Sequence, residues 1–392
     1  MKVVMLFPGL IDALPPLTTA ALSLSQHGAK VTVVAAGASE ECQRYLTCRN
    51  VAVTTLGIGS YPQVGTARLV VQVRTVLAYL SKVKKTRPDV IWYHGGHAMR
   101  YAWLRSAEIV VAHAHEMYSE RTFLAWAQRS VTRMASVCIA PEENRAWMLR
   151  LASHSKARWF VIPNRLNEDS EFGVADPNYA RELFLRHGGD PRCTRFVIYQ
   201  GIFMESRCLK EIVAAFGMLR CENTGLILLG ASDGDRYSQE LRILAKSDPR
   251  IAVIPRIPPP LHLRVTCGCA VGLLLYAPSN INNVYCAPNK IFEYADFGIP
   301  MVLPDYPGLA RLNSAYAIGE FCNPLDPQSI LLSLEKSLAR SKSDAAASAR
   351  SFLDGCARPI DEYRKVYECL GQLLTERHRL RPGSGDSVMV DL

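Results

Sequence analysis

The chain lacks any apolar run long enough to cross a membrane as a helix. Among its 392 residues none of the runs approaches the ~20 consecutive apolar residues that a spanning helix needs. The longest run, residues 271–276, has the length of a strand. Lys2 and the apolar residues after it resemble the start of a signal peptide, but Asp12 and Pro15 interrupt them and no A-x-A-like cleavage site follows. We therefore expect a first strand here and a cytoplasmic protein.

Several short motifs are also missing. The 12 cysteines contain no C-x-x-C pair, so a zinc ribbon or a disulfide framework is not expected. No G-x-G-x-x-G is present, which disfavours a nicotinamide-binding enzyme. The net charge of +9 is spread along the chain and accompanies no nucleic-acid-binding motif, so nucleic acid is not an expected partner.

What the chain does contain is a repeated strand–helix pattern. A strand at residues 3–7, a helix at 17–27 and a strand at 30–35 form a βαβ unit, which requires a parallel sheet with helices on its faces. Further strands are predicted at 51–55, 89–93, 108–113 and 136–140, and a long amphipathic helix at 67–85. The basic end of that helix suits the helix dipole; the alternative is a basic face for a membrane or an acidic acceptor.

The pattern restarts after a polar segment with several glycines and prolines, residues 167–191, which we interpret as a linker. The second half has predicted strands at 196–200, 225–230, 251–254 and 270–276. Helices are expected at 209–220, 325–340 and 361–377. The length and the apolar content of 49% allow two domains with separate cores.

Residues 285–303 carry the clearest functional signal. Pro288 suits the first turn of a helix that Gly298 and Pro300 end. Lys290 lies in that first turn, where the helix dipole is already positive and a lysine is disfavoured unless an anion is present. Glu293 is on the same face, where it could accept hydrogen bonds from ribose hydroxyls. The two residues therefore suggest a nucleotide site; the alternative is a solvated Lys–Glu pair.

This stretch resembles the nucleotide-sugar motif of GT-B-fold retaining glycosyltransferases (group 1, family 4-like), with Glu293 at the position of the second motif glutamate. The resemblance implies an α/β fold of two Rossmann-like doubly wound domains facing a cleft. The expected organisation is an N-terminal acceptor-side domain (1–165), a linker (166–194), a nucleotide-sugar-binding domain (195–355), a helix crossing back to the first domain (356–380) and a flexible tail (381–392).

The resemblance also implies site residues. Arg207 and Lys290 would neutralise the diphosphate, Glu293 would hold the ribose, and His115, in the segment His113-Ala-His-Glu116, would face the donor sugar. The remaining expected donor-site positions are Gly9, Gly201, Asn289 and Tyr285. Two positions depart from the family pattern: Tyr285 stands where the first motif glutamate belongs, and Ile202 where the loop arginine belongs.

No metal site and no cofactor beyond the donor substrate are expected. His94, His97, His113 and His115 lie close in the sequence, but their spacing matches no zinc signature. The only Asp-x-Asp in the sequence is Asp233–Asp235, and the resemblance implies an enzyme that works without a bound metal.

The expected function is transfer of a sugar from a nucleoside-diphosphate sugar to an acceptor hydroxyl, in glycan, polysaccharide or glycolipid biosynthesis. The expected partners are the donor, a glycan, lipid-linked or small-molecule acceptor, and, through peripheral contact, the inner face of the membrane. Three alternatives are a nucleotide-sugar epimerase or hydrolase of the same fold, a catalytically weak partner subunit, and a plain doubly wound binding protein.

Overall fold

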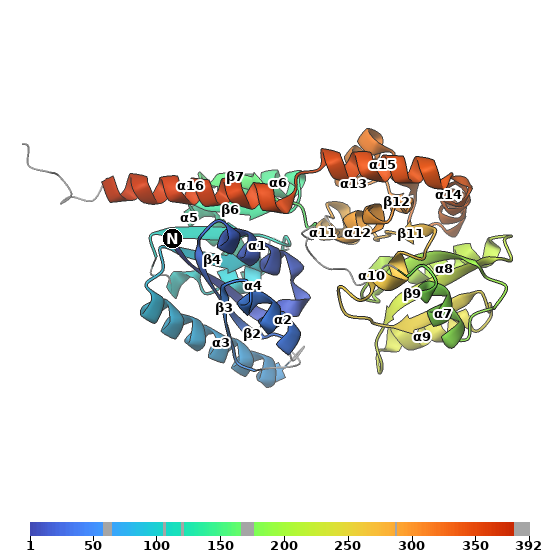
Figure 1. Cartoon of the computed structure of the whole chain (residues 1–392), viewed down its shortest axis with the longest axis horizontal. Helices are drawn as coiled ribbons and strands as arrows, with labels where there is room; N and C mark the ends of the chain where they lie inside the picture. Colours follow the sequence, from blue (N-terminus) through green and yellow to red (C-terminus); the bar gives the residue numbers. More distant parts are fainter. Residues whose placement is uncertain (58–64, 105–106, 119–120, 166–175, 287, 380–392) are drawn as a thin grey trace, which may run out of the picture. The chain divides into compact units, whose positions relative to one another are not determined.

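The computed structural model describes residues 1–57, 65–104, 107–118, 121–165, 176–286 and 288–379. The chain divides into two compact units, Met1–Asn167 with Ala357–Leu392, and Glu168–Cys356. Each unit is an open parallel sheet with helices on both faces, so both belong to the doubly wound class (Figure 1). No helix among the described residues is long and apolar enough to cross a membrane.

The first unit contains a seven-stranded parallel sheet in the order β3-β2-β1-β4-β5-β6-β7. Its strands are β1 (Lys2–Leu10), β2 (Lys30–Gly37), β3 (Val51–Thr55), β4 (Val90–His94), β5 (Ile109–His113), β6 (Val137–Ala140) and β7 (Arg158–Val161). Its helices are η1 (Ile11–Ala13), α1 (Pro15–Gln26), α2 (Glu40–Thr47), α3 (Gly65–Thr86), α4 (Gly95–Met99), η2 (Ala102–Leu104), α5 (Phe123–Met134), α6 (Glu143–Ser153) and α16 (Pro359–Arg379).

Two apolar layers cover the faces of this sheet. One face packs against α1, α2 and α16, and Tyr363 of α16 lies 6.2 Å from Trp92 of β4 between ring centroids. The other face packs against α3, α4, α5 and α6. Every residue of β4 and β5 is buried, which is typical of central strands in a parallel sheet covered on both faces.

The second unit contains a six-stranded parallel sheet in the order β10-β9-β8-β11-β12-β13. Its strands are β8 (Arg195–Gln200), β9 (Thr224–Ala231), β10 (Ile251–Pro255), β11 (Val271–Leu273), β12 (Met301–Pro304) and β13 (Gly319–Cys322). Its helices are α7 (Tyr179–Arg186), η3 (Glu205–Arg207), α8 (Leu209–Met218), α9 (Arg236–Ala245), α10 (Leu263–Thr266), α11 (Ile281–Val284), α12 (Lys290–Asp296), α13 (Pro307–Tyr316), α14 (Pro327–Ala339) and α15 (Lys342–Gly355). Residues of α7, α10, α12, α13 and α15 pack on one face, and residues of α8, α9 and α14 on the other.

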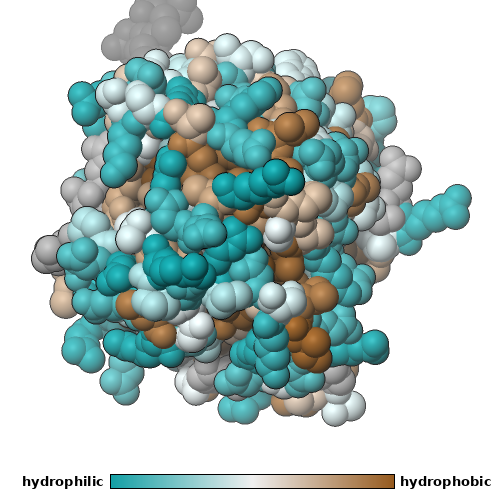
Figure 2. Space-filling model, turned by 90° about the vertical axis from the view of Figure 1, so that its right-hand side faces the viewer, coloured by the Kyte–Doolittle hydropathy of each residue, from teal (hydrophilic) through white to brown (hydrophobic). Residues whose placement is uncertain are grey.

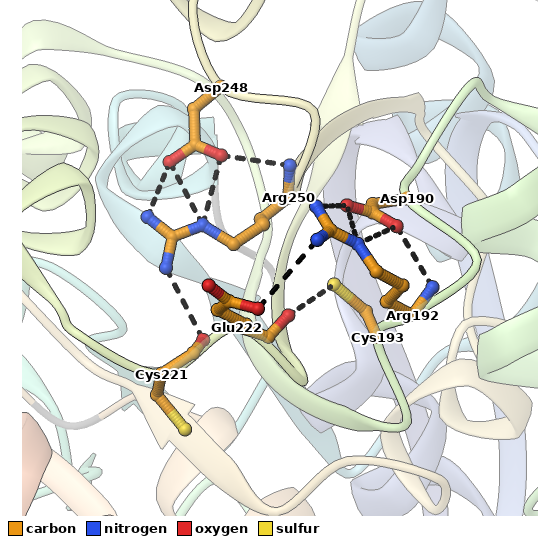
Figure 3. Close-up of polar contacts among 7 residues, drawn as sticks. All are labelled: Asp190, Arg192, Cys193, Cys221, Glu222, Asp248 and Arg250. Atoms are coloured by element: carbon orange, nitrogen blue, oxygen red, sulfur yellow. Dashed lines mark hydrogen bonds and ion pairs between the residues drawn. The ribbon is translucent and has the colours of Figure 1, made fainter.

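A polar network joins the segments that enter β8, β9 and β10 at their amino ends (Figure 3). Two Asp-x-Arg pairs, Asp190–Arg192 and Asp248–Arg250, have the same geometry. In each, the arginine donates from its backbone N–H and its guanidinium to the carboxylate two residues earlier. The closest ion-pair distance is 2.7 Å in both pairs. Arg250 also donates to the carbonyl oxygens of Leu219 and Cys221 at 2.8 and 3.3 Å. This network links the segments at the amino ends of the strands, on the side of the sheet opposite their carboxyl ends.

Two predicted strand boundaries need correction. β1 does not end before Gly9 but continues to Leu10, because a bulge between Phe7 and Leu10 accommodates Pro8 inside the strand. β11 ends at Leu273 although the apolar run continues to residue 276; Leu274, Leu275 and Tyr276 are buried without being strand.

The segment interpreted as a linker, 166–194, is only partly described. Its residues 166–175 lie outside the described residues, and 179–186 form α7, whose Ala180, Leu183 and Phe184 are buried in the core of the second unit. The predicted tail, 381–392, also lies outside the described residues.

Candidate functional site

The candidate donor site lies at the carboxyl ends of the central strands of the second unit, where ligands bind in open parallel sheets. β8 ends at Gln200, and Gly201 follows with a φ of +131°, a conformation that side chains rarely tolerate. A Cβ at Gly201 would lie 3.0 Å from the Lys290 Nζ, and a Cβ at Gly230 would collide with the Gly201 carbonyl oxygen. Gly201 therefore lets the Lys290 side chain cross the end of β8.

Lys290 and Arg207 are brought together over two tyrosine rings. The Lys290 Nζ lies 4.1 Å from the ring centroid of Tyr199 and 5.9 Å from that of Tyr276. The Arg207 guanidinium lies 4.2 Å from the centroid of Tyr276, and its Nη1 donates to the Asn283 Oδ1 at 3.5 Å. Cation–π contacts of this kind hold the two cations close to each other without a carboxylate between them.

Lys290 is a buried cation whose charge the neighbouring carboxylate balances only in part. Burial, and then the neighbouring charge of Arg207, lower the pKa of Lys290 to about 7, and Glu293 opposes the shift only in part. An anion bound between Lys290 and Arg207 would reverse both effects. The pair is therefore suited to a diphosphate, whose oxygens accept charge-assisted hydrogen bonds from ammonium and guanidinium groups.

Glu293 turns away from Lys290 into a buried polar network, and no ion pair between these two described residues is present. Its Oε2 accepts a hydrogen bond from the Gln200 Nε2 at 2.6 Å and lies 3.4 Å from the His262 Nε2. Thr266 in turn donates from its hydroxyl to the Gln200 Oε1. The network fixes one carboxylate oxygen and leaves Oε1 as an acceptor for ligand hydroxyls, so the solvated Lys–Glu pair considered from the sequence does not form.

The other predicted positions of this unit lie around α12. Helix α12 begins at Lys290, with Asn289 as its N-cap residue, and not at Pro288. The Asn289 side chain accepts no capping hydrogen bond. Tyr285 is the C-cap of α11 and is half-buried. Because α12 has only seven residues, the side-chain cations supply more of the positive charge here than its dipole does.

In the first unit, His115 follows the central strand β5. Its carbonyl oxygen accepts a hydrogen bond from the Arg145 Nη1 of α6 at 2.7 Å, and the next carbonyl, of Glu116, accepts one from the Gln128 Nε2 of α5 at 2.6 Å. Burial, and then Arg145, lower the pKa of His115 to about 3, so its imidazole is neutral at physiological pH. Two further histidines, His94 and His113, surround it.

Gly9 lies within β1 and not in a loop, and a Cβ there would meet the ring of Phe7 at 2.8 Å. The closeness of the Phe7 ring therefore accounts for a glycine at this position. Asp235, from the Asp-x-Asp pair, caps α9: its Oδ2 accepts hydrogen bonds from the backbone N–H and the hydroxyl of Ser238, both at 2.7 Å. That carboxylate is thus engaged in helix capping.

Sequence reasoning did not identify Tyr199, Tyr276, Gln200 or His262 as site residues. Tyr199 and Gln200 are the last two residues of a predicted strand, where ligand-facing side chains are common, and this signal could have found them. His262 offered no signal, because it reaches Glu293 from a different part of the chain.

The chain resembles known proteins in part of its sequence and in its fold. Residues 17–169 match the model of the family "Glycosyltransferase Family 4". The whole chain resembles HepE of Anabaena, solved with UDP and glucose (15% identity, 95% of this chain, 100% of that chain, TM-score 0.70).

Two further solved structures are similar. One is sucrose-phosphate synthase from Thermosynechococcus elongatus (14% identity, 97% and 98% covered, TM-score 0.67). The other is WaaG, a glycosyltransferase involved in lipopolysaccharide biosynthesis (13% identity, 94% and 99% covered, TM-score 0.65). At such identities the likeness demonstrates a common fold of two Rossmann-like domains. No curated protein matches the chain significantly in sequence.

Proposed function

We propose that this chain, whose fold is that of GT-B glycosyltransferases and whose residues 17–169 match a glycosyltransferase family, is a retaining glycosyltransferase which transfers a sugar from a nucleoside-diphosphate sugar to an acceptor hydroxyl. One observation carries the proposal. Lys290 and Arg207 converge over Tyr199 and Tyr276 at the carboxyl end of β8. Glu293 lies close to them, and Gln200 and His262 contact its Oε2.

The proposed chemistry follows from the charges. Breaking the bond between the sugar and the diphosphate leaves negative charge on the diphosphate, and pre-positioned cations stabilise that charge as it develops. Lys290 and Arg207 supply these cations, while the Oε1 of Glu293 accepts hydrogen bonds from the ribose hydroxyls. His115, being neutral, would act in the reaction as a hydrogen-bond partner and not as a cation.

The test is product analysis with and without an acceptor. The protein is incubated with a nucleoside-diphosphate sugar that binds it, and the products are followed by NMR. A new glycoside with the anomeric configuration of the donor supports a retaining transferase. Inversion would overturn the retaining mechanism. An epimerised or hydrolysed sugar, formed equally fast with no acceptor, would favour the epimerase or hydrolase alternative.

We also propose that the first unit contacts an anionic membrane, so that the acceptor is a lipid-linked glycan or a glycolipid at the inner face. The helical layer α3–α6 carries an unusual number of exposed apolar side chains, including three tryptophans that are 53–76% exposed. They are Leu69, Val70, Val73 and Leu77 of α3, Trp103 of η2, Phe123, Trp126 and Met134 of α5, and Trp147 and Leu151 of α6.

The charge of this layer is positive. Helices α3 and α5 contain no acidic residue. The exposed basic residues beside the apolar ones are Arg74, Lys84, Lys85, Arg121, Arg133 and Arg150. Exposed tryptophans beside lysines and arginines are typical of surfaces that lie in the headgroup region of a membrane. On the face drawn in Figure 2, by contrast, apolar side chains are scattered in small groups among hydrophilic ones.

Co-sedimentation with vesicles tests this contact. The protein should bind vesicles that contain an anionic phospholipid and not neutral ones. Since a basic residue near such a surface contributes about 1 kcal/mol, the double variant Lys84→Gln/Lys85→Gln should bind roughly 30-fold more weakly. Trp126→Ser should also weaken binding, and Ile243→Ser, an exposed position of α9 in the other unit, should not. Equal binding by all variants would contradict the proposal.

A further inference from the structure

Three histidines converge on one point of the first unit. β4 and β5 are neighbours in the centre of the sheet, and their register pairs His94 with His113 at the carboxyl ends of the two strands. His115 lies two residues beyond, where the backbone is held by Arg145 and by a hydrogen bond from the Ala114 N–H to the Ile139 carbonyl at 2.8 Å. The ring centroids of the three histidines lie 4.1–5.5 Å apart.

The hydrogen bonding of this group is incomplete. The only hydrogen bond among the rings joins the His94 Nδ1 and the His115 Nε2 at 3.2 Å. Three other ring nitrogens, the His94 Nε2, the His113 Nδ1 and the His115 Nδ1, are buried and have no hydrogen-bond partner in the part of the chain that the structure describes. Each neutral imidazole has one lone pair, so one bond among three neutral rings leaves two lone pairs unused. Unused acceptors are costly when buried, because they have lost their water.

The geometry is close to that of a set of metal ligands. One ring nitrogen from each histidine lies within 4.8 Å of the other two. Around a tetrahedral zinc ion with Zn–N bonds of about 2.0–2.1 Å, neighbouring ligand nitrogens are about 3.3 Å apart. The 3.2 Å between His94 and His115 already matches this spacing, and the third ring has to approach by about 1.5 Å at most.

We propose that His94, His113 and His115 bind a divalent transition-metal ion of the zinc type. Within the described residues no carboxylate or thiolate joins the group, and three imidazoles favour zinc, nickel or copper over magnesium, calcium or manganese. Of these three residues, His115 is the one that is not fully buried. The Arg145 guanidinium lies beside His115 and opposes a second cation, so we expect micromolar affinity, weaker than that of a structural zinc site.

Such an ion would fix the orientation of the His115 ring. This inference does not depend on the proposed transfer reaction, because the ligand set belongs to the first unit alone and binding is measured without a sugar donor.

The test is metal binding by the full-length protein after chelator treatment, in the presence of a reductant. Zinc is titrated in competition with a chromophoric chelator, and cobalt is titrated with detection of its visible absorption. We expect one ion per chain and the spectrum of a tetrahedral site with nitrogen ligands. His113→Gln should weaken zinc binding at least tenfold, whereas His154→Asn, at an exposed histidine, should bind as tightly as the original protein.

Two results would overturn the proposal. One is a zinc affinity that is the same in His113→Gln and in the original protein, provided that circular dichroism shows both to be folded. The other is a thiolate-to-cobalt charge-transfer band in place of the nitrogen-ligand spectrum, which would place the ion on some of the 12 cysteines. If His113→Gln does not fold, His94→Gln replaces it with the same expectation.

Discussion

At the scale of single residues, Lys290 has the most unusual environment. Its ammonium lies over the Tyr199 ring, where Gly201 leaves room for it, and its neighbour Arg207 repels it. A lysine in this state destabilises the ligand-free protein, because burial disfavours its charged form. Binding of an anion relieves that cost, and affinity for a diphosphate is therefore linked to the protonation of Lys290.

This linkage predicts a pH dependence of ligand binding. The pKa of Lys290 is about 7 in the free protein and rises when a diphosphate is bound. Below pH 7 the ammonium is already charged; above pH 7 binding must take up a proton, so the affinity should fall by up to tenfold per pH unit. The terminal phosphate of the ligand titrates near pH 6 and is constant between pH 7 and 9. Calorimetric titration across this range measures the effect.

Lys290→Met is the matched variant. It should bind nucleoside diphosphates weakly and with no decrease between pH 7 and 9. Without ligand it should unfold at a higher temperature than the original protein below pH 7, because the unfavourable burial of the charge is fully present there and is relieved only as the pH rises from 7 towards 10. A pH profile identical to that of the original protein would exclude Lys290 as the titrating group.

Gln200 is predicted to act by positioning Glu293. Gln200→Leu removes the donor that holds the Glu293 Oε2, so the carboxylate loses its fixed orientation and nucleoside diphosphates should bind about tenfold more weakly. Gln200→Glu, which places a second carboxylate against Glu293, should weaken binding further. Nucleotides lacking the ribose hydroxyls separate the two roles: their affinity should be equal in Gln200→Leu and the original protein.

At the scale of helices and strands, the sequence predicted what depends on local pattern. The helix predicted at 67–85 is α3, Gly65–Thr86, which has a long amphipathic pattern. The strand predicted at 196–200 is β8, Arg195–Gln200, a short and mostly apolar segment. The strand predicted at 270–276 is shorter in the structure. An apolar run indicates that its residues are buried, but it does not indicate which of them pair with a neighbouring strand.

The candidate site was predictable only in part. Lys290 was predicted from the motif and Arg207 from the loop after the first strand of the second half. In the structure both side chains lie near the ring of Tyr276. The partners of Glu293 could not be predicted, because Gln200 is 93 residues away and the contact depends on the order of the strands. Glu293 was expected to face the same way as Lys290, and only the contacts with Gln200 and His262 show that it does not.

The Asp-x-Arg network predicts a stability effect without a binding effect. Arg250→Met leaves the Asp248 carboxylate unpaired and removes the hydrogen bonds to the Leu219 and Cys221 carbonyls. We expect a loss of about 2 kcal/mol in the free energy of unfolding of the second unit. Because the network is at the amino ends of the strands, the affinity for nucleoside diphosphates at a temperature where the variant is folded should be unchanged. A parallel loss of affinity would show that the two edges of the sheet are coupled.

At the scale of the whole molecule, both units are doubly wound, yet they carry different surfaces and different charged groups. The second unit holds the cations and the carboxylate that suit a nucleoside diphosphate. The first unit holds the histidine group and the apolar, basic helical layer. We predict that nucleotide binding depends on residues of the second unit and membrane binding on residues of the first.

The most direct measurement is thermal unfolding of the purified protein with a panel of nucleoside diphosphates and their sugars. A ligand at about 100 times its dissociation constant should add about 2.7 kcal/mol to the free energy of unfolding, visible as a clear rise in melting temperature. We predict such a rise with the nucleotides of one base, lost in Glu293→Ala and strongly reduced in Lys290→Met. No rise with any member of the panel, or a rise that both variants retain, would contradict the assignment of the donor site.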